Sequence, residues 1–195
     1  MDKRRLTLML DVLTAAAILW MLIQLPIPST PRDPAHFWRY RREILRTLAS
    51  VLWLMGLWLD MYPAWDGAGR VGMMTALLVA GQAFCVALTP YMTDLIIESY
   101  MGRFSHQLYG LTMLGTAAFC WLIQRSLKRD DPVDAMHAAA CDRCGKTLLV
   151  AMGVMLVGLI VAYGKLRQAM WYSVALAAVW LLGASVAAAL SKKPA

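Results

Sequence analysis

The chain has 195 residues, of which 60% are hydrophobic and only 16% are charged. Soluble domains average roughly 45–50% apolar and about 25% charged residues, so both values depart toward a lipid environment. This composition excludes a soluble enzyme, a disordered tail and a secreted disulfide scaffold. The net charge of +7 does not indicate nucleic acid as a partner, because 12 acidic residues dilute it. We expect the basic side chains to face the headgroups of a lipid bilayer instead.

Six segments are apolar enough and long enough to be membrane-spanning helices, which need about 20 such residues each. They are Leu6–Ile27, Ile44–Tyr62, Val71–Met92, Gln107–Gln124, Thr147–Tyr163 and Gln168–Leu190. Proline and glycine residues punctuate most of the breaks between them. The sequence therefore predicts an all-α integral membrane protein, a six-transmembrane-helix bundle that forms a single transmembrane domain over residues 1–195.

Six spans place both chain ends on one side of the membrane. More of the 19 Lys and Arg residues would lie on that side than on the other, which favours both ends in the cytoplasm. The bias is small because a basic stretch, Trp38–Arg46, falls on the outer side, where we expect its basic side chains to reach the headgroups. Short loops without glycosylation signals favour a bacterial inner (plasma) membrane.

Two acidic residues lie inside the predicted spans, and an ionisable residue there is a functional candidate by default. Asp11 lies about one turn into the first span, and Asp60 lies near the end of the second. Arg5 and Asp11 are six residues apart, roughly 120° around a helix, so they do not share a face. We therefore expect Asp11 to find its partner on another helix, with Arg70 as a candidate. The alternative is that both acids simply contact water at the membrane surface.

Cys141 and Cys144 form a C-x-x-C pair in the loop predicted before the fifth span, and His137 lies just upstream. Such a pair binds zinc or forms a redox disulfide in other proteins. A zinc site needs a fourth ligand, which Asp134 or a second subunit would have to supply. A single half-site is a weak signal, so we favour reduced thiols and predict neither a metal site nor a cofactor.

Four short motifs follow one another in the order that one membrane-protein family shows. Arg5 and Asp11 occupy the first and last positions of R-x-x-x-F-S-D, with Met9 and Leu10 in place of Phe and Ser. Trp58-Leu-Asp60-Met61 resembles W-x-N-H, the residues 88–93 resemble L-L-P-F-P-T, and the residues 108–111 read L-Y-G-L. Over Arg5–Gln124 the chain thus resembles the transmembrane protein 175 family, the endosomal and lysosomal potassium channels and their bacterial relatives.

The resemblance implies a cation channel that conducts potassium, assembled as a homotetramer in bacterial members. In that family the first helix of each subunit lines the pore, and rings of apolar side chains on it form the constriction. Carried over by position, Arg5, Asp11 and Asp60 would form a network that fastens the first helix to its neighbours. The constriction falls on Ala16 and a nearby pore hydroxyl on Leu19. Because an alanine ring leaves a wide gap, we expect Leu13 and Leu19 to supply the apolar ring.

Two other functions stay open from the residues alone. The first is a small proton- or ion-coupled transporter in which Asp11 and Asp60 titrate, although transporters place such groups near the midplane and these acids lie near one end. The second is a non-catalytic membrane interaction protein that works through the Asp130–Lys146 loop. Neither a glycine-rich phosphate loop nor an H-E-x-x-H motif occurs in the sequence, and we do not expect an enzyme.

Overall fold

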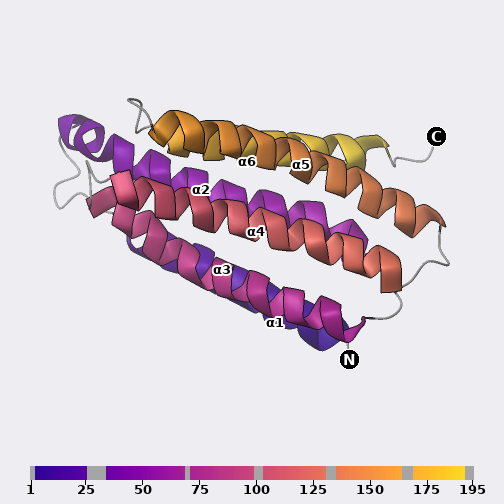
Figure 1. Ribbon diagram of the computed structural model, residues 1–195. Coiled ribbons are helices and arrows are strands. Elements are labelled where there is room, and N and C mark those ends of the chain that lie inside the picture. The colour runs from indigo at the N-terminus through magenta and orange to yellow at the C-terminus, as the bar shows by residue number, and fades with distance from the viewer. Residues whose placement is uncertain are drawn as a thin grey trace.

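The computed structural model describes residues 3–25, 34–68, 71–98, 103–130, 135–163 and 169–191. Within these ranges the chain folds into α1 (Lys3–Ile23), α2 (Pro34–Gly67), α3 (Met73–Glu98), α4 (Arg103–Asp130), α5 (Ala135–Tyr163) and α6 (Ala169–Ser191). Consecutive helices run antiparallel, so α1 begins and α6 ends at the same end of the bundle (Figure 1). The predicted all-α membrane bundle is confirmed.

The bundle is layered, with α2 and α4 in the middle (Figure 1). On one side α3 packs against α4 and carries α1 on it, and on the other side α5 and α6 pack together against α4 and α2. The first helix contacts α3 most extensively and α2 along part of its length. As a result α1 lies at the edge of the bundle and leaves one of its faces without a neighbour.

Five helices of the described chain are long and apolar enough to cross a membrane: α1, α2 from Tyr40 onward, α3, α5 and α6. The protein is therefore an integral membrane protein. The more polar α4 runs alongside them through the bundle (Figure 1), and some of its polar side chains are enclosed by other helices. Thr116 and Gln124 are at most 1% exposed, and Trp53 Nε1 of α2 donates to Thr116 Oγ1 at 3.0 Å.

Two helices begin well before the apolar segments that predicted them. The second begins at Pro34 and not near Ile44, and the fifth begins at Ala135 and not near Thr147. An apolar run marks only the part of a helix that lies in lipid, whereas the backbone continues as a helix through the polar residues before it. Proline at the first position favours such an extension of α2, because the missing N–H would be unpaired there anyway.

The headgroup contact expected for Arg46 is wrong. This side chain is 1% exposed, and its Nη1 donates to the backbone carbonyl of Ile96 at 2.9 Å in the last turn of α3. The end of a helix presents unpaired carbonyls and a partial negative charge, which a guanidinium satisfies well. Beside it, Ser50 bonds to the Tyr109 hydroxyl at 2.9 Å and accepts from Thr93 at 3.0 Å. These contacts join α2, α3 and α4 at the end opposite the chain termini.

Candidate functional site

The first helix has two distinct faces. The side chains that pack into the subunit recur at helical spacing: Leu6, Leu10, Thr14, Ala17 and Met21. A second row, named the exposed stripe here, consists of Leu8, Val12, Ala15, Leu19 and Ile23. Its four larger side chains are between 59% and 67% exposed in the single chain. An apolar row of this kind in a membrane protein contacts either lipid or another subunit.

The residues predicted to form the constriction do not all lie on that stripe. Leu19 is part of it, and Ala16 is exposed beside it. Leu13 packs against the core, and together with Ala16 it lines a groove of about 420 Å³ between α1 and α3 that Pro90 also borders. Six residues of helix turn Leu13 roughly 120° away from Leu19, which explains the difference. Val12 and Ala15 were missed, although the 3.6-residue period through Leu19 includes both.

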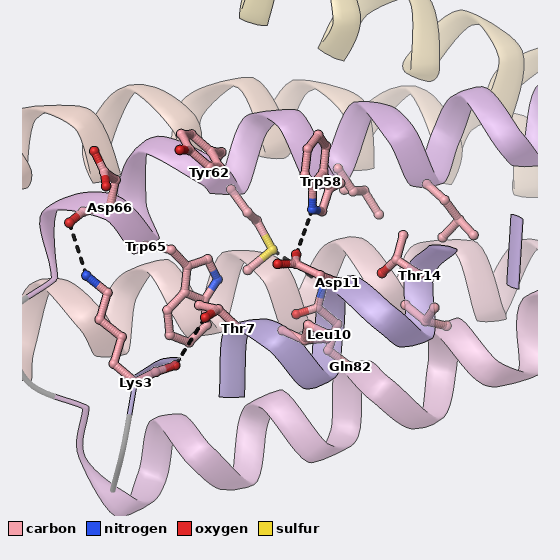
Figure 2. A pocket seen from close by; sticks show the side chains of 14 residues that line it. Lys3, Thr7, Leu10, Asp11, Thr14, Trp58, Tyr62, Trp65, Asp66 and Gln82 are labelled. Carbon is pink, nitrogen blue, oxygen red and sulfur yellow. Dashed lines mark hydrogen bonds between the residues drawn. The ribbon is translucent and has the colours of Figure 1, made fainter. Parts of the chain in front are cut away.

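Asp11 finds its partner on α2. Trp58 Nε1 donates to Asp11 Oδ1 at 2.8 Å, as Figure 2 shows. A hydrogen bond from an N–H group to a carboxylate is stronger than one to a neutral acceptor. The predicted partner, Arg70, lies outside the described residues. Asp11 is the aspartate that matches the R-x-x-x-F-S-D motif, and Trp58 is the tryptophan that matches the W-x-N-H motif. The bond therefore joins two of the motifs.

Lys3 provides a further attachment of α1 to α2. Its Nζ donates to the carbonyl of Ala68 at 2.7 Å and to that of Asp66 at 3.1 Å, just where α2 ends. Figure 2 shows the contact with Asp66. A lysine satisfies the unpaired carbonyls at a helix C-terminus and complements its dipole. Arg5, one of the predicted network residues, lies two positions further along α1 and is exposed. Lys3 was not singled out, because no feature of the sequence indicates that it reaches α2.

Asp60 is bonded to a different helix. It is 5% exposed, and its Oδ1 accepts from Thr147 Oγ1 of α5 at 3.0 Å. Asp11 thus serves the contact between α1 and α2, whereas Asp60 serves the contact between α2 and α5. The single network that would include Arg5, Asp11 and Asp60 stays a prediction.

The C-x-x-C cysteines lie within the first turns of α5 and not in a loop. Cys141 and Cys144 form no disulfide in the described part of the chain, and each is 4% exposed, so they pack as small apolar side chains. Asp134 and the side chain of His137 lie outside the described residues. Among the side chains that the structure describes, no three potential ligands cluster around a possible metal position.

Comparison with solved structures gives a close match in shape. The bundle resembles the crystal structure of a lysosomal potassium-selective channel TMEM175 homolog from Chamaesiphon minutus, with a TM-score of 0.76. The match covers 93% of this chain and 97% of that chain at 15% sequence identity. No protein-family model matches the chain, and no curated protein sequence matches it. The resemblance drawn from the four motifs is confirmed at the level of structure: the chain has the fold of this TMEM175 homolog.

Proposed function

We propose that this protein is a cation channel that conducts potassium, formed by a homotetramer in which α1 of each subunit lines the pore. The observation that supports it most strongly is the exposed stripe of α1 on a chain that has the fold of a potassium-selective channel. One subunit cannot enclose a path for ions with a single helix at its edge. Several copies related by a rotation axis can, because closed symmetry brings the same face of every copy to the axis.

The chemistry of the stripe indicates how such a pore is gated. The rings of apolar side chains in such a pore would come from Val12, Leu19 and Ile23, which lie one to two turns apart. The smaller side chains of Ala15 and Ala16 lie between the rings of Val12 and Leu19. A narrow apolar ring excludes water and therefore stops hydrated ions until it widens. In this proposal Leu19 is the main constriction, Ala16 borders it, and Leu13 supports it from the α3 side.

The polar contacts of α1 explain how the helix is held while its stripe faces the axis. Lys3 and Asp11 bond to α2 in the first half of α1. The second half of the helix is held mainly by packing. In the proposed network, Arg5 and Asp60 support the same end of the bundle. We place both chain ends in the cytoplasm and the protein in a bacterial inner membrane, following the excess of basic residues on the side of the termini.

Ion flux through reconstituted protein tests the proposal. Purified protein in liposomes should pass potassium down its gradient without a driving ion, and Leu19→Ala should change the rate because it removes most of the apolar ring. The matched control is Leu176→Ala, the same substitution at a 61% exposed leucine on α6, which should leave the rate unchanged. Assembled protein that passes no potassium would contradict the channel, and flux that requires a proton or sodium gradient would indicate the coupled transporter.

A further inference from the structure

A cavity of about 200 Å³ lies between α1, α2 and α3 near the end of the bundle where α1 begins (Figure 2). It is larger than the engineered cavity of about 150 Å³ that admits benzene in another protein. Asp11 lines it from α1, the rings of Trp58, Tyr62 and Trp65 line it from α2, and Gln82 lines it from α3. The cavity is thus large enough for a molecule with one ring, and its walls combine aromatic and polar groups.

Gln82 lines this cavity and carries a buried hydrogen-bond acceptor without a partner among the described residues. Its side chain is 6% exposed, and its Nε2 donates to Cys120 Sγ at 2.9 Å and to Met61 Sδ at 3.4 Å. Its Oε1 has no hydrogen-bond partner in the described part of the chain. A buried acceptor without a partner carries the full cost of its lost hydration. Oε1 is closed to water in this structure, so a donor inside the cavity would relieve that cost after a rotation of the side chain that exposes the oxygen.

Asp11 contributes a carboxylate of which only one oxygen accepts a hydrogen bond from the described residues. Figure 2 shows its carboxylate between Trp58 and Gln82. Oδ1 accepts the indole N–H of Trp58, and Oδ2 accepts from none of the residues that the structure describes. Lys3 also lines the cavity, but it donates to the backbone carbonyls at the end of α2. The carboxylates of Asp11 and Asp66 give the lining its negative charge, and the hydroxyl groups of Thr14 and Tyr62 can either donate or accept.

The aromatic walls favour a cation with an apolar body over a bare metal ion. Trp58 and Tyr62 have ring centroids 6.3 Å apart and are inclined by 52°, and Trp65 lines the cavity with them. Aromatic faces attract cations, and they do so best when the cation is weakly hydrated. A potassium ion would have to exchange its hydration shell for few oxygens here, whereas an organic ammonium would bury its carbon atoms against the rings.

We propose that this cavity binds a small organic ammonium, a protonated primary amine that carries one ring. Its N–H groups donate to Asp11 Oδ2 and Gln82 Oε1, and its ring packs among Trp58, Tyr62 and Trp65. Binding at this site goes beyond the proposed channel activity, because every group that recognises the ligand belongs to one subunit and no ion has to flow.

Titration calorimetry on the full-length protein in detergent tests the proposal, with benzylammonium as the probe and benzyl alcohol as a neutral molecule of similar size. Benzylammonium should bind saturably at one site per subunit, and benzyl alcohol should bind at least about tenfold more weakly, because charge-assisted hydrogen bonds are roughly twice as strong as neutral ones. Equal affinity for the two probes would overturn the proposal. So would the absence of benzylammonium binding, which would indicate that lipid or a neighbouring subunit fills the cavity.

Two substitutions locate the site. Asp11→Asn removes the charge but keeps an oxygen for the Trp58 N–H, and it should weaken benzylammonium binding about tenfold. Gln82→Leu removes the unpaired acceptor at similar size and should weaken binding roughly three- to tenfold. The control is Asp142→Asn, which removes an exposed acid on α5 outside the cavity and should leave the affinity unchanged. Each substitution tests one contact of the same cavity, so one variant is enough to test the site if the other does not fold. Unchanged affinity in a folded variant contradicts the contact assigned to that residue.

Discussion

The hydrogen bond between Trp58 and Asp11 is a specific residue contact that fixes α1 on α2. The indole N–H lies 2.8 Å from the carboxylate oxygen. Asp11 is exposed and Trp58 is 43% exposed, so the bond lies on the surface of the bundle. A contact of this kind orients a helix as well as holding it, because the indole N–H points in one direction only.

A double-mutant cycle measures this bond. Trp58→Phe keeps an aromatic ring but removes the donor, and Asp11→Ala removes the acceptor. Each should lower the free energy of unfolding in mixed micelles by about 1 kcal/mol, the usual net value of one hydrogen bond. The double variant should lose clearly less than the sum of the two, because either substitution already breaks the bond. Fully additive losses would show that the two residues do not depend on each other.

The sequence predicts part of this residue-level arrangement. The 120° between Arg5 and Asp11 correctly places the partner of Asp11 on another helix. The identity of that partner could not be predicted, because Trp58 carries no charge that would distinguish it from the other tryptophans. The buried position of Arg46 could not be predicted for a related reason. Its partner is a backbone carbonyl of α3, and the contact exists only once α2 and α3 pack together.

At the scale of elements, the start of α3 is capped by the end of α4. Asp130 accepts from the backbone N–H of Gly72 at 2.8 Å and from Thr75 Oγ1 at 2.7 Å. A carboxylate at this position satisfies an unpaired N–H and complements the positive end of the helix dipole. The cap therefore stabilises α3 and joins it to α4 at the end of the bundle where the termini lie.

Removing the cap should be costly, whereas removing a surface ion pair should not. Asp130→Ala should lower the free energy of unfolding by about 0.5–2 kcal/mol, the range found for lost N-caps. The control is Asp142→Ala, which removes an exposed partner of Lys128 and should leave stability unchanged within error. Thermal unfolding of the two variants in the same detergent makes the comparison, and equal losses would show that the Asp130 contacts do not cap α3.

Close packing of α5 on α6 depends on one glycine and not on another. A side chain at Gly158 would overlap Ser173 of α6 at its Cβ, which cannot move without the backbone, whereas a side chain at Gly153 would meet open space. Gly158→Ala should therefore lower stability by roughly 1–3 kcal/mol through overpacking. Gly153→Ala should leave stability unchanged or raise it slightly, because alanine favours a helix. A similar loss for the two variants, measured by unfolding in mixed micelles, would contradict this packing.

The sequence predicts the helices better than their lengths. Hydropathy locates the lipid-facing part of each helix, so it finds all of the helical segments that the structure describes. It cannot detect the first turns of α2 and α5, which precede the apolar segments. The early start of α5 is the reason why Cys141 and Cys144 lie inside a helix. The hydropathy signal for a membrane span is lowest for α4. A helix that other helices largely enclose does not need an apolar surface toward lipid.

At the scale of the whole molecule, one helix at the edge of the bundle connects the fold to the proposed function. The order of four motifs predicts the fold of a TMEM175 homolog, and the comparison of structures confirms that fold. The direction in which α1 faces could not be predicted, because it is set by how α1 packs on α3. For this reason Leu19 lies on the exposed stripe, whereas Leu13 lies against the core of its own subunit.

A cysteine scan of α1 tests the central claim most directly. Single cysteines are introduced into protein whose 4 native cysteines are replaced, and potassium flux into liposomes is measured before and after a charged thiol reagent. Modification should block flux in Val12→Cys, Leu19→Cys and Ile23→Cys, and it should leave flux unchanged in Leu10→Cys and Ala17→Cys, which lie on the packed face. Block at Leu10→Cys and Ala17→Cys without block on the stripe, or an assembled protein that conducts no potassium, would contradict a pore lined by α1.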